Sequence, residues 1–189
     1  MFTRIRRKLK MEKSLIIAGF GGQGVMLTGK ILGYAATDHN KKAVFLPQYG
    51  TQQRGGTASC NVIISDDKVG CPIVGKADNM MIFKQPSMEV FVPRLKKGGL
   101  LMMNSTLCSM PERDDITIID LPVDDIALGL GAQQVANLIM LGAFVEKTGL
   151  FTVDEIVTTM QHLLSKHPEM LEVNEKALRE GAELIRKRQ

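Results

Sequence analysis

One stretch near the start of the chain, Ser14 to Gly24, limits most strongly what this sequence can fold into. The apolar residues Leu15 to Ala18 predict a buried parallel strand, and Val25 to His39 predict a helix. Four glycines separate the two: Gly19, Gly21, Gly22 and Gly24. A helix that begins in such a loop leaves backbone N–H groups free at its first turn, and its dipole attracts anions. The stretch therefore predicts an α/β fold with a loop that suits phosphate.

The same glycines match the spacing of the dinucleotide-binding fingerprint, but a second requirement of that fingerprint is missing. The motif needs an acid at the end of the second strand, about twenty residues beyond the glycines, to hold the ribose hydroxyls. We expect that strand over Lys42 to Leu46, ended by Pro47, and no Asp or Glu follows it there. The sequence therefore disfavours NAD as the ligand.

Composition and charge exclude further classes. The net charge is +4, but five basic residues lie within the first ten positions, so the rest of the chain is close to neutral and carries no nucleic-acid footprint. No apolar run approaches the ~18 residues of a membrane span. We expect residues 1–12 to be a basic, disordered extension and residues 13–189 to form a single domain. Met11, directly before the first strand, is an alternative start of the chain.

The cysteines and histidines predict neither a metal site nor a catalytic set. Cysteines occur only at Cys60, Cys71 and Cys108, without a Cys-x-x-Cys pair, which indicates buried apolar residues in a reducing cytoplasm. The histidines are His39, His162 and His167. They fall at helix ends or in polar helical segments, without a positioned nucleophile and acid. We therefore expect no catalytic residue and no metal ligand in this chain.

The remaining segments alternate between strand and helix signals, which predicts a three-layer α/β/α fold with a mostly parallel central sheet and a helical C-terminal third. Gly29 and Gly33 share one face of the first helix and would let it approach the sheet. Further strands are expected over Thr57–Ser65, Met80–Phe83, Leu100–Met103 and Ile116–Ile119. A further helix is expected to begin at a Ser87 cap, to run through Leu95 and to be closed by Gly98 and Gly99. Another is expected over Gln133–Lys147. The last two are expected after the capping box Thr152–Glu155 and from Pro168 onward.

Three loops are expected at the carboxyl edge of this sheet, where open α/β sheets bind ligands. Their candidate ligand-binding residues are Gly19, Gly21, Gly22, Gln23 and Gly24; Tyr49, Arg54, Gly55 and Gly56; and Asn104 and Ser105. Arg54 is the one charged residue within Gln48–Gly56. Glycine N–H groups, an arginine, amides and hydroxyls suit a phosphate-bearing ligand. The alternative is that the glycines serve only tight turns and a subunit contact, and the pattern leaves both interpretations open.

Several of these segments together resemble a known family. They are the GFGGQG run that ends at Gly24, the segment Tyr49–Ala58 with its QRGGT, Val62–Asp66, Gly98–Leu101 and Ala136–Gly142. From about Lys13 to near Glu183 the chain is similar to the gamma subunit of 2-oxoacid:ferredoxin oxidoreductases. The basic residues before Met11 depart from that pattern.

The resemblance implies a role in a multi-subunit enzyme. Such complexes decarboxylate a 2-oxoacid oxidatively, use coenzyme A and reduce ferredoxin. The resemblance implies that alpha, beta and ferredoxin-like delta subunits hold thiamine diphosphate, Mg and the iron–sulfur clusters. This chain would then be a non-catalytic subunit that helps to accommodate coenzyme A. The sequence around Arg54, QYGTQQRGG, resembles the 2-oxoglutarate and branched-chain 2-oxoacid enzymes most. A free-standing nucleotide-binding dehydrogenase domain and a purely structural scaffold remain the alternatives.

Overall fold

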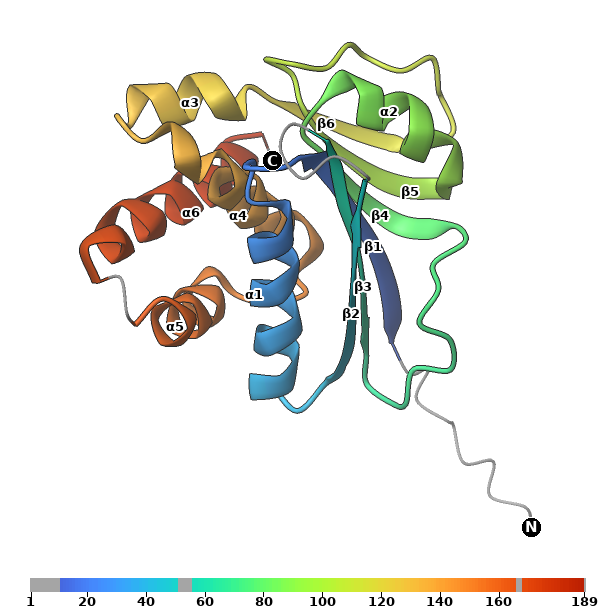
Figure 1. The fold of residues 1–189 in the computed structure, drawn as a ribbon, viewed down its shortest axis with the longest axis horizontal. Coiled ribbons are helices and arrows are strands. Elements are labelled where there is room, and N and C mark those ends of the chain that lie inside the picture. The colour runs from blue at the N-terminus through green and yellow to red at the C-terminus, as the bar shows by residue number, and fades with distance from the viewer. Residues whose placement is uncertain (1–10, 51–55, 166–167, 189) are drawn as a thin grey trace.

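The computed structural model describes residues 11–50, 56–165 and 168–188, and a six-stranded sheet lies at its centre (Figure 1). The strand order is β2-β3-β1-β4-β5-β6. β1 pairs in parallel with β4, β4 with β5 and β5 with β6, whereas β3 is antiparallel to both β1 and β2. The first strand was expected to pair in parallel with its neighbours. It does so with β4, but it pairs antiparallel with β3. The strands are β1 Glu12–Phe20, β2 Lys42–Tyr49, β3 Thr57–Ser65, β4 Ala77–Ile82, β5 Leu95–Asn104 and β6 Thr117–Leu121.

Helices cover both faces of the sheet, which confirms the three-layer α/β/α arrangement and the helical C-terminal third. α1, α4, α5 and α6 lie on one side, and α2 lies on the other (Figure 1). The sequence did not indicate α3, which follows β6. The helices are α1 Val25–Asp38, α2 Gln85–Phe91, α3 Val123–Gly129, α4 Ala136–Thr148, α5 Val153–Leu163 and α6 Leu171–Arg186. Short 3-10 turns precede or follow them at Val92–Arg94, Gln133–Val135 and Pro168–Met170.

Two apolar cores form because side chains alternate across the strands. Leu15 and Ile17 of β1 belong to the larger core under α1 and α4, and Ile16 and Ala18 belong to the smaller core under α2. The methionine pairs of β4 and β5 divide between the cores in the same way, which confirms their expected role as core residues. The sheet is therefore buried on both faces along its central strands.

β2 runs past Pro47 to Tyr49, so the expected end at Pro47 was wrong. Pro47 pairs with Cys60 of β3, and β2 is an edge strand. An edge strand bonds to a single neighbour, and a residue without an N–H is tolerated there. The strand therefore carries the chain to the carboxyl edge of the sheet.

The helix expected from Ser87 through Leu95 is shorter and differently capped. α2 begins after Lys84, Ser87 lies inside it, and the Ser87 hydroxyl is buried without a hydrogen-bond partner among the described residues. Gly98 and Gly99 lie within β5 instead of closing a helix. Gly98 has φ +70°, and the β4–β5 register shifts here, which is where a strand needs glycine.

Asp78 of β4 ties its strand to both neighbours. Its carboxylate accepts hydrogen bonds from the Ser14 backbone N–H (2.9 Å), the Ser14 hydroxyl (2.7 Å) and the Lys96 ammonium (2.8 Å). Burial alone would raise the pKa of Asp78, but the bonds from Lys96 and Ser14 outweigh it and hold this pKa below its usual value. A carboxylate with a lowered pKa stabilises the fold above its unfolded pKa, and this stability is lost as pH falls through the folded pKa.

We therefore expect Asp78→Asn to lower the free energy of unfolding at pH 7 by about 1–2 kcal/mol. This is the low end for a charge-assisted hydrogen bond, because the site is partly exposed. The difference from the wild type should shrink below about pH 4, where the unfolded carboxyl protonates. Urea unfolding between pH 3 and 7 measures it, with the exposed Asp114→Asn as control. An equal difference at every pH would contradict the account.

The cysteines separate into two environments. Cys60 and Cys108 are buried, as expected, but Cys71 is exposed, so that part of the expectation was wrong. Cys71 lies in the segment between β3 and β4, outside regular structure. Burial raises the pKa of the Cys60 thiol to about 12 and that of Cys108 to about 11. Thiols of this kind are inert because the thiolate is the nucleophile.

A thiol reagent at pH 8 should therefore label Cys71 of the folded chain at least a hundredfold faster than the two buried thiols. With Ellman's reagent, the absorbance of the released chromophore measures the labelling. Added denaturant should then make the Cys60 and Cys108 thiols react as well. Cys71→Ser should remove the fast phase alone. A fast phase that survives in Cys71→Ser would show that a thiol assigned to the core is accessible.

Candidate functional site

The described parts of the expected loops meet at the carboxyl edge of the sheet. The Gly21 N–H donates to the Gly56 carbonyl (3.1 Å), which joins the glycine loop to the connection between β2 and β3. At the base of that connection the Gly50 N–H donates to Thr57 O (2.8 Å). Arg54 and Gly55 lie outside the described residues. The glycine loop thus contacts the β2–β3 connection at Gly56, within the part of that connection that the structure describes.

The loop after β1 keeps its shape through its own hydrogen bonds and glycines. The Phe20 N–H donates to Gln23 Oε1 (2.8 Å), and the Gln23 N–H donates to the Phe20 carbonyl (3.2 Å). Gly22 and Gly24 have φ of +99° and +73°, a conformation that strains other residues. A Cβ at Gly19 would lie 2.7 Å from Gln23 Oε1. Gly19, Gly22 and Gly24 therefore each have a backbone or packing reason to be glycine.

α1 begins at this loop with an uncapped first turn. Gly24 is its N-cap, no side chain accepts a hydrogen bond there, and the first turn holds no acid. A helix start of this kind carries partial positive charge and free N–H donors. Gly29 lies against Phe45 and Cys60, which confirms for this residue that a glycine lets α1 approach the sheet. A Cβ at Gly33 would make only ordinary contact with Phe45 (3.9 Å), so the close approach does not require glycine there. The geometry therefore favours an anion beside the glycine loop.

Asn137 of α4 supports the start of α1 from behind. Its amide group donates to the Thr28 hydroxyl (3.2 Å) and to the Gly24 carbonyl (3.4 Å), and it is 2% exposed. Sequence reasoning missed this role. The available signal was a single asparagine within the otherwise apolar run 136–145, because a buried amide needs partners.

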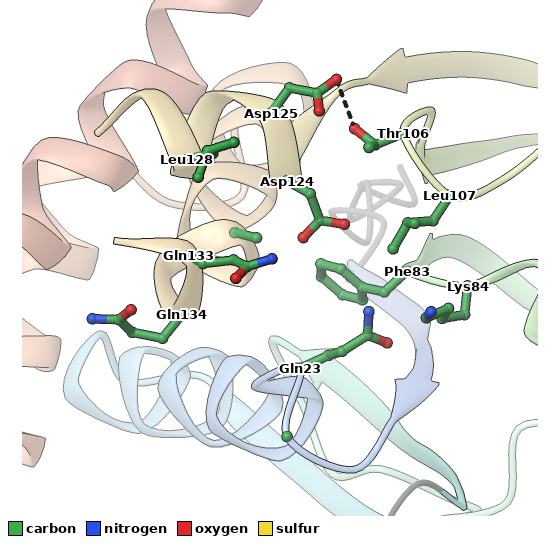
Figure 2. A pocket seen from close by; sticks show the side chains of 12 residues that line it. Gln23, Phe83, Lys84, Thr106, Leu107, Asp124, Asp125, Leu128, Gln133 and Gln134 are labelled. Carbon is green, nitrogen blue, oxygen red and sulfur yellow. Dashed lines mark hydrogen bonds between the residues drawn. The ribbon is translucent and has the colours of Figure 1, made fainter. Parts of the chain in front are cut away.

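Two clefts open on either side of the glycine loop, and Gly22 lines both. The hairpin cleft, of about 890 Å³, lies between the loop, the start of α1 and the β2–β3 connection. It is lined by Phe20, Gly21, Gly22, Gly24, Val25, Met26, Leu27, Tyr49, Gly50, Gly56, Thr57 and Ala58. The central cleft, of about 650 Å³, lies between the loop, the ends of β4 and β5, and α3 (Figure 2). It is lined by Gly22, Gln23, Phe83, Lys84, Thr106, Leu107, Asp124, Asp125, Leu128, Gln133, Gln134 and Ala136.

The end of β5 holds the acids of the central cleft in place. The Asn104 amide donates to Asp124 Oδ2 (2.7 Å) and to the Phe83 carbonyl (3.3 Å), and the Thr106 hydroxyl donates to Asp125 Oδ2 (3.2 Å). Asn104 is fully buried. Neither Asn104 nor Ser105 lines either cleft. The structure thus places Asn104 behind the cleft wall, where it orients Asp124.

Several cleft residues were not singled out from the sequence, and Lys84 is the most notable. It directly follows Phe83 at the carboxyl end of β4, and its ammonium lies 5.6 Å from the centroid of the Phe20 ring. Within the described part of the chain, it is the one cationic side chain that lines either cleft. The signal that could have found it is a lysine at the carboxyl end of a parallel strand.

The histidines lie away from both clefts where they are described. His39 follows the far end of α1, with Nδ1 3.3 Å from Glu155 Oε1, and His162 is exposed on α5. His167 lies outside the described residues. Across residues 11–50, 56–165 and 168–188, no group of His, Cys, Asp and Glu side chains is arranged to hold a metal ion. The helices in those ranges include none long and apolar enough to cross a bilayer.

Comparison with known protein families and sequences gives consistent matches. The family model described as pyruvate ferredoxin/flavodoxin oxidoreductase matches residues 14–184. The 2-oxoglutarate synthase subunit KorC of Methanocaldococcus jannaschii is 36% identical over 156 residues, which cover 80% of this chain and 83% of KorC. The ketoisovalerate oxidoreductase subunit VorA of Methanothermobacter marburgensis is 34% identical over 178 residues. That match covers 93% of this chain, which spans only 37% of the length of VorA.

Solved structures agree with these matches. The gamma subunit of a keto/oxoacid ferredoxin oxidoreductase from Geobacter sulfurreducens has a TM-score of 0.79 and 30% identity, covering 93% of this chain and 99% of that one. A 2-oxoglutarate:ferredoxin oxidoreductase from Magnetococcus marinus, 19% identical, shares the fold with a TM-score of 0.86. The match covers 93% of this chain and 31% of the longer Magnetococcus marinus chain. The family model and these relatives together show that the chain belongs to the pyruvate ferredoxin/flavodoxin oxidoreductase family.

Proposed function

We propose that this chain is the non-catalytic gamma subunit of a thiamine diphosphate-dependent 2-oxoacid:ferredoxin oxidoreductase. The complex would convert a 2-oxoacid, coenzyme A and oxidised ferredoxin into acyl-CoA, CO₂ and reduced ferredoxin. In this proposal the gamma subunit contributes to assembly and accommodates coenzyme A. The observation that carries the proposal is the uncapped first turn of α1, which opens beside the glycine loop onto the hairpin cleft.

The donor set at this site fits a phosphate-bearing cofactor. Free N–H groups at the start of α1 suit phosphate oxygens, and the glycines Gly21, Gly22 and Gly56 let a ligand approach the backbone closely. Phe20 and Tyr49 add apolar surface. The Magnetococcus marinus enzyme, which shares this fold, is described with coenzyme A and succinyl-CoA bound. Arg54 and Gly55, outside the described residues, belong to the same proposed site by their position in the chain.

The proposed partners are alpha, beta and ferredoxin-like delta subunits, with ferredoxin as the external acceptor. Thiamine diphosphate, Mg and the iron–sulfur clusters would reside in those subunits. The relatives VorA and KorC are named as subunits, which supports an assembly of several chains. The names of KorC and VorA favour 2-oxoglutarate or a branched-chain 2-oxoacid as substrate. We place the complex in the cytoplasm, because the three cysteines of this chain are free thiols.

The alternatives have less support. A dehydrogenase domain needs an acid at the end of β2 to hold ribose, and Gln48 and Tyr49 stand there instead. A purely structural scaffold needs no uncapped helix start that opens onto a cleft. Neither alternative predicts that changes in the glycine loop alter the use of coenzyme A.

Reconstitution of the complex tests the proposal. The isolated chain should show no 2-oxoacid-dependent reduction of ferredoxin or of a dye, and the assembled complex should turn over. Gly22→Ala, which strains the loop at φ +99°, should raise the apparent KM for coenzyme A at least fivefold in a complex that still assembles. Gly70→Ala, at an open position with no such φ, is the matched control. Unchanged coenzyme A kinetics in assembled Gly22→Ala, or micromolar binding of NAD to the isolated chain, would overturn the proposal.

A further inference from the structure

We propose that Lys84 is an anion-binding residue of the central cleft, which contacts a phosphate group of the cofactor. This inference rests on the proposed function and adds to it a side chain that the sequence motifs did not indicate. The argument depends on where the fold fixes the Lys84 backbone, on what surrounds its ammonium group and on how charge is distributed across the cleft.

The fold fixes the Lys84 backbone on both sides. The Phe83 N–H donates to the Ala18 carbonyl (2.9 Å), which extends the pairing of β4 with β1 up to the residue before Lys84. The Lys84 carbonyl accepts hydrogen bonds from the N–H groups of Ser87 (3.0 Å) and Met88 (3.3 Å) at the start of α2. Lys84 therefore stands at a defined point beside the glycine loop.

The ammonium group is held near the cleft without an internal counter-ion. It lies 5.6 Å from the centroid of the Phe20 ring, which orients the cation. Among the described residues, no carboxylate lies within ion-pair distance of it, whereas Lys41 and Lys96 each pair with an aspartate at 2.8 Å. Lys84 is half-buried. A half-buried cation that lines a cleft in this way is suited to an anion from outside the chain.

Charge is divided between the two walls of the cleft. Figure 2 shows Lys84 and Gln23 on the side of the glycine loop, with Asp124 and Asp125 projecting from α3 on the other side. The acids disfavour an anion at the α3 wall, so an anionic group is drawn toward Lys84. Lys84 and Asp124 also act in opposite directions on the pKa of the buried Cys108 thiol, Lys84 lowering it and Asp124 raising it.

The start of α1 and the Lys84 ammonium then lie on opposite sides of one glycine loop, because Gly22 lines both clefts. A cofactor that carries more than one phosphate group can be held by both. Lys84 supplies a compact charge with three donors, whereas the helix start supplies backbone N–H groups. The phosphate at Lys84 belongs either to the pyrophosphate or to the 3′-phosphate of coenzyme A.

Steady-state kinetics on the reconstituted complex with Lys84→Gln test the inference. We expect at least a tenfold rise in the apparent KM for coenzyme A, with kcat and the KM for the 2-oxoacid unchanged. Lys84→Arg keeps the charge and should recover most of the affinity. The exposed Lys30→Gln on α1, which lines neither of these two clefts, is the matched control and should behave as the wild type.

Shortened cofactors identify the phosphate group. The effect of Lys84→Gln should vanish with pantetheine, which has no phosphate. If it persists with dephospho-CoA, Lys84 contacts the pyrophosphate, and if it disappears there, Lys84 contacts the 3′-phosphate. Coenzyme A kinetics that are unchanged by Lys84→Gln but altered by Gly22→Ala would overturn the role of Lys84 and leave the proposed function standing. Unchanged kinetics in both variants would overturn both. Failure of Lys84→Gln and Lys84→Arg to assemble would show an interface residue instead.

Discussion

Gly142→Ala should destabilise this protein strongly, because an added methyl group there would meet backbone. α4 and α6 cross with their backbones in direct contact: a Cβ at Gly142 would overlap the Leu178 carbonyl, and one at Gly181 would overlap the Ile139 carbonyl. Both helices belong to the larger core, so they cannot separate without opening it. Overpacking of a core costs about 1–3 kcal/mol and occasionally more. Because backbone opposes the added atom here, we expect a loss of about 3 kcal/mol or more, a large share of a typical domain's stability.

Urea unfolding followed by circular dichroism measures this loss. Gly129→Ala is the matched control, since Gly129 ends α3, and a Cβ there meets nothing within 4 Å. That change should be neutral or stabilise by up to about 1 kcal/mol, as expected for glycine replaced in a helix. Equal unfolding midpoints for the two variants would show that α4 and α6 do not pack through these glycines.

Arg54→Ala should raise the apparent coenzyme A constant of the assembled complex by roughly tenfold to a hundredfold. Arg54 is two residues before Gly56, which lines the hairpin cleft, and it is the one charged residue within Gln48–Gly56. A charge-assisted contact is worth roughly 1.5–3 kcal/mol, which sets the expected range. Arg54→Lys should recover only part of the affinity, because the ammonium keeps the charge but lacks the bidentate fork. The KM for the 2-oxoacid should stay unchanged.

Titration of coenzyme A into reconstituted complexes gives these constants, with exposed Lys30→Ala on α1 as the control for removal of a cation. The double variant Arg54→Ala, Lys84→Gln reports whether the two cations act on the same ligand. A double variant that assembles and loses no more affinity than either single variant would show that they hold one phosphate together. A reduced yield of assembled Arg54→Ala complex, with unchanged coenzyme A kinetics in the fraction that assembles, would assign Arg54 to a subunit interface.

Signals within a few residues of each other predicted much of the fold correctly. The capping box at α5 is present, with the Thr152 N–H donating to Glu155 Oε2 (2.7 Å) and the Glu155 N–H donating to Thr152 Oγ1 (3.2 Å). The strand Thr57–Ser65 and the start of α1 at Val25 also lie where the pattern places them. Hydrophobic period, caps and glycine spacing are local properties, so a sequence can display them without its fold.

Contacts between distant segments decided the rest. The antiparallel direction of β3 and the extension of β2 past Pro47 depend on which strands become neighbours. Asn137 reaches Gly24 across 113 positions of sequence, and Asn104 orients Asp124 from another element. Lys84 becomes a cleft residue only because β4 pairs with β1 and carries it to the glycine loop. The sequence alone thus determined most of the elements and the glycine loop, whereas tertiary packing decided which side chains share a cleft, because such contacts join residues that no local pattern relates.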